Sequence, residues 1–233
     1  MFFYSNLQFM YKHFFKRFFD ILFSFIALCI LSPLLVPISI GLLLTGEHYI
    51  FYFQKRIGYK NKPFFIWKFA TMLKNSPNLG TGLHTTRKDP RILPMGNFLR
   101  KTKINELPQI INILIGDMSI IGPRPLVDKT FEPYPDHVKA IIYNVKPGLT
   151  GVGSIVFRDE ERLLSETKLP LEEFYKLHIS PYKGELELWY QKNLGLYTDF
   201  MLVFLTAWVI ASPDSQLVYR VFKDLPARPA LLK

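Results

Sequence analysis

The stretch ILFSFIALCILSPLLVPISIGLLLTG, Ile21 to Gly46, contains no charged residue and constrains how the rest of the chain can be arranged. An apolar run of this length can cross a bilayer as a helix, whereas the core helices of soluble proteins are shorter and amphipathic. The run is also too long for a signal peptide, and no clear small-residue cleavage site follows it. The sequence therefore indicates a membrane-associated protein.

Two prolines, Pro33 and Pro37, stand near the middle of this stretch. Each lacks a backbone donor, so we expect the helix to break there, with Ser32 hydrogen-bonding a carbonyl that a proline frees. Aromatic and basic residues flank the stretch on both sides, in YKHFFKRFFD and in HYIFYFQKR. A simple span usually shows more positive charge on one side, so these flanks favour a re-entrant helix with both ends cytoplasmic; a kinked span is the alternative.

The composition describes a protein with a real core and an anionic partner. The chain has 233 residues, is 49% hydrophobic and carries a net charge of +10. Anionic lipid, a phosphorylated substrate and nucleic acid would all suit that charge. The aromatic residues lie in or beside apolar runs rather than in a polar basic groove, which argues against nucleic acid. The single cysteine, Cys29, excludes an intramolecular disulfide framework and a cysteine-rich metal site.

A candidate site lies in KTKINELPQ, Lys101 to Gln109, where the carboxylate of Glu106 follows the carboxamide of Asn105 among basic residues. The later GPRP supplies Arg124 between two prolines, and an arginine held in this way suits bidentate phosphate recognition. A helix capped by Asn105 would also point backbone N–H groups at an anion. These residues predict a phosphate site beside an acid/base residue. The alternative is a capped helix whose Glu106 stabilises its own N-terminus, surrounded by solvated charges.

Several stretches together carry a resemblance to a known family: KRFFDILFSFIALCILSP, FQKRIG, KFATM, FLRKTKINELPQIINILIGDMSIIGPRP and KPGLTG. On these stretches the chain resembles the bacterial sugar transferase family, the monotopic polyprenyl-phosphate phosphoglycosyl transferases, from about Phe15 to Ser212. The resemblance implies transfer of a sugar-1-phosphate from a UDP-sugar to polyprenyl (undecaprenyl) phosphate, with release of UMP. This would be the first membrane step of glycoconjugate (polysaccharide) assembly. It also implies Mg²⁺ as cofactor, the cytoplasmic face of a bacterial inner membrane, and anionic lipid and downstream glycosyltransferases as further partners.

The resemblance also assigns roles to residues. The family uses an Asp-Glu pair, of which the Glu falls on Glu106, and a Pro-Arg-Pro motif whose arginine, here Arg124, contacts phosphate. The helix break falls on Ser32–Pro33, and the Mg²⁺ ligands would be Asn105 and Glu106. The remaining implied phosphate- or nucleotide-binding residues are Lys55, Arg56, Lys68 and Arg100.

The chain departs from the family pattern in three places. Asn105 stands where the nucleophilic Asp is usual, Ala70 where an Arg is usual, and the Trp-x-Gln expected after KPGLTG is missing. A carboxamide is a poor nucleophile toward phosphorus, although its carbonyl oxygen could bind Mg²⁺. Three interpretations stay open: Glu106 is the nucleophile, Glu106 assists a direct displacement, or the protein is a catalytically silent binder of nucleotide-sugar or partner enzymes. The paired loss of an acid and a base favours a retuned enzyme.

No motif encodes the sugar. The loops NSPNLGTGLHTTRKDP (75–90) and FRDEERLLSETK (157–168) are candidates for specificity. In the second loop, Asp159, Glu160 and Glu161 either contact sugar hydroxyls or Mg²⁺, or form a solvated charged surface.

The expected fold class is α+β. Two aromatic, β-prone runs around GYKNKP in residues 48–70 predict a hairpin, and short helical patterns alternating with loops follow it. We therefore expect a re-entrant N-terminal membrane helix and a small, mostly helical cytoplasmic domain with a β-hairpin. The expected division is 1–47 for the interfacial and membrane helix, 48–212 for the catalytic domain with interfacial helices, and 213–233 for a C-terminal tail.

Overall fold

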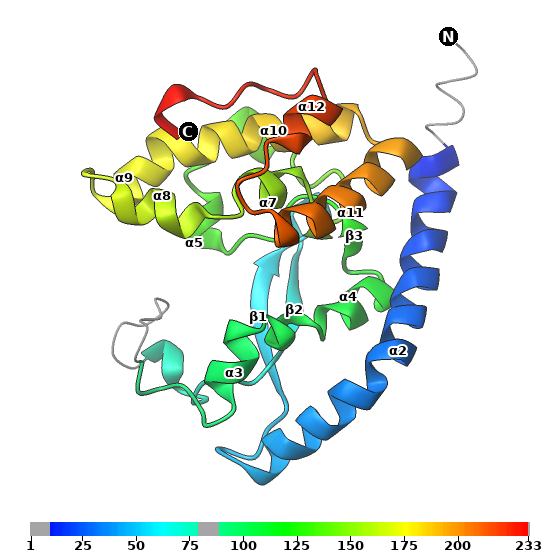
Figure 1. The fold of residues 1–233 in the computed structure, drawn as a ribbon, viewed down its shortest axis with the longest axis vertical. Helices are drawn as coiled ribbons and strands as arrows, with labels where there is room; N and C mark the ends of the chain where they lie inside the picture. Colours follow the sequence, from blue (N-terminus) through cyan, green and yellow to red (C-terminus); the bar gives the residue numbers. More distant parts are fainter. Residues whose placement is uncertain (1–9, 79–88, 233) are drawn as a thin grey trace.

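A long N-terminal helix runs along one side of a body made of a β-hairpin and shorter helices (Figure 1), in a computed structural model that describes residues 10–78 and 89–232. The longest helices are α2 (Lys16–Leu44), α10 (Ser180–Lys192) and α11 (Leu196–Ala211). The shorter helices are α3 (Gly96–Lys101), α4 (Gln109–Ile115), α5 (Asp128–Phe131), α6 (Asp136–Lys139), α7 (Val152–Val156), α8 (Glu160–Glu166), α9 (Leu171–Phe174) and α12 (Leu217–Val221). The strands are β1 (Phe51–Ile57), β2 (Pro63–Phe69), β3 (Ser119–Ile121) and β4 (Gly148–Thr150). Single turns of π-helix (Tyr11–Phe15, Tyr175–Ile179) and 3₁₀-helix (Tyr59–Asn61, Ser76–Asn78, Ile104–Glu106, Ala230–Leu232) complete the elements.

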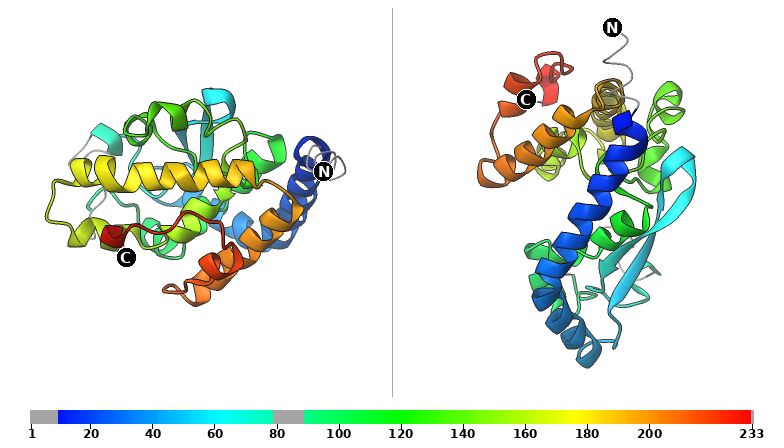
Figure 2. Two further views of the ribbon diagram at one scale, coloured as in Figure 1. Left: turned by 90° about the horizontal axis from the view of Figure 1, so that it is seen from above. Right: turned by 90° about the vertical axis from the view of Figure 1, so that its right-hand side faces the viewer.

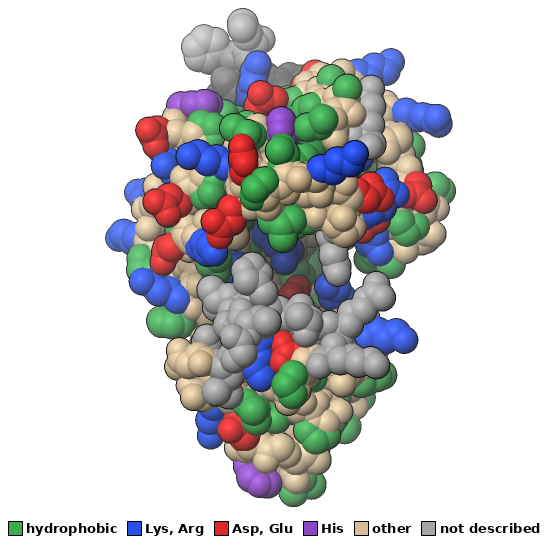
Figure 3. Space-filling model, turned by 90° about the vertical axis from the view of Figure 1, so that its left-hand side faces the viewer, with side chains coloured by type: hydrophobic (Ala, Val, Ile, Leu, Met, Phe, Trp, Pro, Cys, Tyr) green, Lys and Arg blue, Asp and Glu red, His purple; other side chains and the backbone are tan. Residues whose placement is uncertain are grey.

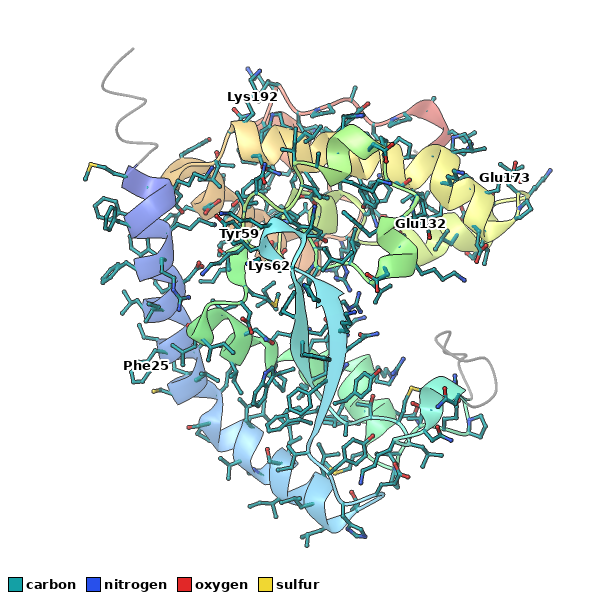
Figure 4. The ribbon with its side chains drawn as sticks, turned by 180° about the vertical axis from the view of Figure 1, so that it is seen from behind. Phe25, Tyr59, Lys62, Glu132, Glu173 and Lys192 are labelled. Carbon is teal, nitrogen blue, oxygen red and sulfur yellow. The ribbon has the colours of Figure 1, made fainter. Side chains whose placement is uncertain are left out.

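Helix α2 is long and apolar enough to cross a membrane. Only 11% of its most apolar window is buried within the protein, and Phe25 projects from it away from the body (Figure 4). The core helix of a soluble protein would be mostly buried, so the exposed apolar surface of α2 indicates membrane association.

The break expected at Ser32–Pro33 is instead a bend within one continuous helix (Figure 1). Pro33 cannot donate to the carbonyl of Cys29, four residues earlier. The hydroxyl of Ser32 donates to that same carbonyl at 2.8 Å. This hydrogen bond replaces the one that Pro33 removes, and the helix continues through both Pro33 and Pro37 as a curve.

Both ends of α2 are tied to the body. Near its start, Lys16 forms a 2.5 Å ion pair with Asp199 at the beginning of α11, and the two helices meet there (Figure 2). Near its end, Ile38 and Leu42 pack against Phe69 of β2 in one buried cluster. Helix α2 therefore lies along the body instead of extending from one end of it.

The predicted hairpin is confirmed, and with it the α+β class. Strands β1 and β2 pair in antiparallel register from Phe51 opposite Phe69 to Ile57 opposite Pro63. The GYKNKP turn closes the hairpin with Lys60 and Asn61 in the left-handed region.

Most of the remaining helices form a layer above the hairpin (Figure 1). The largest buried cluster joins Leu186 of α10 and Leu202 of α11 to residues of the C-terminal segment, among them Val218 and Phe222. The segment expected as a tail thus contributes apolar side chains to the core of the body.

A short parallel pair, which the sequence did not predict, brings two motifs together. Strands β3 and β4 pair so that Ser119 lies opposite Gly148, placing GPRP beside KPGLTG. A Cβ atom on Gly148 would lie 2.1 Å from the backbone nitrogen of Gly122. The two backbones can approach this closely only because both residues are glycines.

Candidate functional site

One face of the hairpin carries two of the basic residues assigned to phosphate. Lys68 of β2 lies opposite Tyr52 of β1. Arg56 lies four residues beyond Tyr52, and alternate residues of a strand point to opposite sides, so Lys68 and Arg56 share a face. Lys55 lies on the other face and is exposed. The hairpin therefore separates Lys55 from its expected partners.

Asn105 and Glu106 lie in a 3₁₀ turn that packs against β2. The expectation that Asn105 caps a helix is wrong, because α4 begins only at Gln109. The amide of Glu106 donates to the carbonyl of Lys103, three residues earlier, at 3.1 Å. This spacing is that of a 3₁₀ turn, so Asn105 lies inside that turn and does not cap α4.

The carboxylate of Glu106 faces positive charge. Its Oε1 lies 3.4 Å from Nζ of Lys68. Burial alone would raise the pKa of Glu106, but Lys68, Arg124 and Lys103 outweigh burial and hold that pKa below its usual value. For Lys68, burial dominates and lowers the pKa to about 8, against the opposing effect of Glu106. Glu106 is therefore an ionised carboxylate at neutral pH.

The Pro-Arg-Pro segment is held by its backbone and leaves its arginine exposed. The hydroxyl of Tyr143 donates to the carbonyl of Arg124 at 2.8 Å and accepts from the amide of Leu126 at 3.0 Å. Nη1 of Arg56 donates to the carbonyl of Pro125 at 3.1 Å. Arg56 thus fixes the loop, while the guanidinium of Arg124 is presented to the site.

A cavity of about 300 Å³ extends from Lys103, Glu106 and Arg124 to helices α7, α8 and α10. Figure 3 shows the protein hollowed at mid-height on one face, with charged side chains of both signs around the hollow. The cavity is lined by Lys103, Glu106, Arg124, Leu126, Tyr134, Ile142, Gly153, Ser154, Phe157, Arg158, Glu160, Lys183 and Glu187. Glu106 and Arg124 are thus brought together, as the sequence predicted.

Arg100 and Ala70 lie outside this lining. Arg100 is on α3, where its Nη1 donates to the hydroxyl of Thr71 at 3.4 Å. Ala70, which follows β2 where the family pattern has an arginine, is fully buried. Four further predicted site residues also lie outside the lining: Lys55, Arg56, Lys68 and Asn105.

The sequence missed Lys183 and Glu187, which enter the cavity from α10. Their spacing of four residues within YKGELELWY, a helical pattern that otherwise buries aromatic side chains, is the signal that could have found them. Glu160, one of the residues open to two interpretations, forms a 2.7 Å ion pair with Lys183 and is partly buried. The other specificity candidate, 75–90, has its residues 79–88 outside the described part of the chain.

The site can be tested for its fit to Mg²⁺. The Oδ1 atom of Asn105 is buried and has no hydrogen-bond partner, and the carboxylate of Glu106 follows it in sequence. Within residues 10–78 and 89–232, no group of three or more His, Cys, Asp or Glu side chains could hold a metal. A carboxamide oxygen and a carboxylate are the kind of donors that Mg²⁺ takes, with its other ligands supplied by substrate phosphates and water.

Comparison with known proteins identifies the family to which this chain is similar. The family model described as bacterial sugar transferase matches residues 11–213. The undecaprenyl-phosphate galactose phosphotransferase of Salmonella typhimurium is 33% identical over 90% of this chain and 43% of its own length. The UDP-glucose:undecaprenyl-phosphate glucose-1-phosphate transferase of Escherichia coli K12 is 34% identical over 83% of this chain and 39% of its own.

A shorter relative is matched over most of its length. The exopolysaccharide production protein ExoY of Sinorhizobium fredii is 33% identical over 82% of this chain and 83% of its own. The chain spans about two fifths of the length of these longer relatives. With a family-model match over nearly the whole chain and relatives that are 33–34% identical, this protein belongs to the bacterial sugar transferase family.

Proposed function

We propose that this protein transfers a sugar-1-phosphate from a UDP-sugar to polyprenyl phosphate and releases UMP, as an initiating step of polysaccharide assembly. The observation that carries the proposal is the ionised carboxylate of Glu106 in one cavity with Arg124 and Lys103. A diphosphate needs cations around it, and phosphoryl transfer needs a positioned base or nucleophile. The activities for which the matched relatives from Salmonella and Escherichia coli are named are of this kind.

The residues of the cavity divide the work. Arg124, on its rigid loop, would bind the donor phosphates and balance the charge that develops during transfer. Glu106 would act either as the nucleophile toward the sugar-bearing phosphorus or as the group that assists attack by the lipid phosphate. The ammonium of Lys68, which lies 3.4 Å from the carboxylate, favours the ionised form of Glu106. Asn105 lacks the anionic oxygen that a phosphoenzyme link requires.

Mg²⁺ fits this proposal as a bridge between protein and substrate. Oδ1 of Asn105 and the carboxylate of Glu106 would hold it. When bound, the ion would neutralise phosphate charge and orient the diphosphate.

The membrane arrangement that we propose is re-entrant. Helix α2 packs against one body at both ends, through Lys16 and through Leu42. A helix that crossed a bilayer once would carry one end to the far side, away from that body. A bent α2 that enters and leaves on the cytoplasmic face of the bacterial inner membrane keeps both contacts, with anionic lipid beside its basic flanks and downstream glycosyltransferases within reach.

Asn105, which stands in place of the usual nucleophilic Asp, favours a second candidate function. In this alternative the protein is a catalytically silent family member that binds nucleotide-sugar without turning it over. An assay of UMP release with undecaprenyl phosphate and a panel of UDP-glucose, UDP-galactose and UDP-N-acetylgalactosamine separates the two. Turnover of any donor, lost in Glu106→Gln, supports the transferase. Tight binding of a donor without UMP release supports the silent member.

A further inference from the structure

The cavity has a second wall that the proposed chemistry leaves unused. Glu106 and Lys103 enter from the loop before α4, whereas Glu160, Lys183 and Glu187 enter from α8 and α10. Arg124 lies within electrostatic range of both walls, because its charge lowers the pKa of Glu106 and that of Lys183. The cavity therefore extends beyond the phosphate-binding residues to a second wall, which carries the carboxyl groups of Glu160 and Glu187 and the ammonium of Lys183.

Within that wall, Lys183 is satisfied by its neighbours. Its ammonium forms the 2.7 Å ion pair with Glu160 and lies over the ring of Phe157 at 5.0 Å. An ammonium paired in this way stabilises Glu160 and adds little free positive charge to the cavity.

Glu187 is not satisfied. Its residue is 4% exposed, and its Oε2 atom is buried without a hydrogen-bond partner. A buried polar atom left unpaired costs free energy, so it calls for a ligand or another explanation. Because Glu187 lines the cavity, a molecule bound there could supply the partner.

The protonation state of Glu187 suggests which partner. Burial raises its pKa to about 8, although Lys183 and the backbone amide of Gly153 oppose the rise. At neutral pH the group is mostly a neutral carboxyl, which both donates and accepts hydrogen bonds. A sugar hydroxyl also donates and accepts, whereas phosphate oxygens only accept and are better served by Arg124.

We infer that Glu187 contacts the sugar of the nucleotide-sugar donor and serves as a specificity residue, with the diphosphate held at the Arg124 wall. This inference rests on the proposed function, because it assumes a UDP-sugar in the cavity. It separates the cavity into a phosphate-binding wall, common to all donors, and a hydroxyl-binding wall around Glu187.

Gly153 gives the carboxyl its room. A Cβ atom at this position would lie 2.4 Å from Oε1 of Glu187. Gly153→Ala would therefore displace the carboxyl without changing its charge or removing it. Gly153→Ala therefore tests the position of the Glu187 carboxyl independently of substitutions at Glu187 itself.

The test is calorimetric binding of UDP-sugar and of UDP to the purified full chain in detergent, using the panel sugar that the wild type binds most tightly. Glu187→Leu should weaken UDP-sugar binding by about tenfold or more and change UDP binding less than about twofold, since only the sugar loses its partner. Glu187→Gln keeps a neutral donor and acceptor and should stay within about threefold of wild type for both ligands. Gly153→Ala should also weaken the binding of UDP-sugar more than the binding of UDP, as Glu187→Leu does. Glu185→Leu, at an exposed position on the same helix, is the matched control.

Equal weakening of UDP and UDP-sugar in Glu187→Leu, or no weakening of either, would overturn the inference. So would a Glu187→Gln variant as impaired as Glu187→Leu, or a wild type that binds UDP-sugar no more tightly than UDP. Thermal unfolding of each variant shows that the comparison is made on folded protein, and Gly153→Ala replaces Glu187→Leu in the comparison if the leucine variant fails to fold. A wild type that discriminates sugar but releases no UMP would refute the transferase and leave this inference standing.

Discussion

The ammonium of Lys68 on β2 lies 3.4 Å from the carboxylate of Glu106, joining the hairpin to the loop before α4. The pair is partly enclosed: the Lys68 side chain is 16% exposed and that of Glu106 31%. The pair thus joins two segments 38 positions apart, and of the two residues Glu106 lines the cavity.

Lys68→Met should therefore reduce turnover by about 10- to 100-fold, because Glu106 loses the cation that favours its ionised form. The measurement is initial-rate UMP release at saturating donor. Lys62→Met, at the exposed tip of the same hairpin (Figure 4), is the control and should leave the rate unchanged. Equal rates in Lys68→Met and wild type would remove the ion pair from the mechanism.

Glu106→Gln should eliminate measurable turnover, whereas Asn105→Ala should weaken it only by loss of a metal contact. The reason is that Glu106 is the one of the two that can carry an anionic oxygen. Mass spectrometry of the protein mixed with UDP-sugar and no lipid acceptor tests the same point, with no sugar-phosphate adduct expected at residue 105. An adduct mapped to Asn105, or full activity in Glu106→Gln, would refute the assignment.

Arg124→Ala should cost about 2–4 kcal/mol in nucleotide-sugar binding while the protein stays folded. The fold should persist because the loop is held through backbone hydrogen bonds to Tyr143 and Arg56. Tyr143→Phe removes the hydroxyl that fixes the loop, and a smaller loss of affinity is expected. Binding isotherms and thermal unfolding measure both effects; undiminished affinity in Arg124→Ala would place the phosphates elsewhere.

Stability should fall as pH rises from about 4.5 to about 8, in part through Glu187, whose pKa is raised from 4.5 to about 8. Between these values the unfolded chain has released the proton and the folded chain has kept it, so rising pH favours unfolding by up to about 1.4 kcal/mol per unit. Above the folded pKa this loss is complete. The ionisable groups that interact with Glu187 are Lys183, Tyr134, Tyr143 and Tyr190.

Denaturant unfolding in detergent at a series of pH values measures this slope. The free energy of unfolding of Glu187→Gln should depend less on pH than that of wild type over the same range, because the amide does not titrate. Identical slopes in the two proteins would mean that Glu187 ionises normally.

Accessibility labelling tests the membrane arrangement. In a Cys29→Ser background, single cysteines at Lys12 before α2 and at Lys192 on the body should react with an impermeant reagent from the same side of inner-membrane vesicles. Both positions are exposed. Reaction of Lys12→Cys and Lys192→Cys from opposite sides would show that α2 crosses the bilayer.

The sequence by itself determined the elements whose signal is local. An uncharged run of 26 residues specifies an apolar helix wherever it lies. The aromatic runs around GYKNKP specify a hairpin through turn chemistry and β-propensity, and GPRP specifies a stiff loop. The resemblance added that Glu106 and Arg124 belong to one site, and the cavity contains both.

Only the tertiary structure decided what depends on contacts between distant segments. The pleat of β1 directs Arg56 and Lys55 to opposite faces, although both are basic and adjacent in sequence. Helix α2 is continuous where two prolines predicted a break, and Ser32 supplies the hydrogen bond that Pro33 removes. Glu187 becomes a buried carboxyl because α10 packs against α7 at Gly153, and the raised pKa that follows comes from packing that no local pattern encodes.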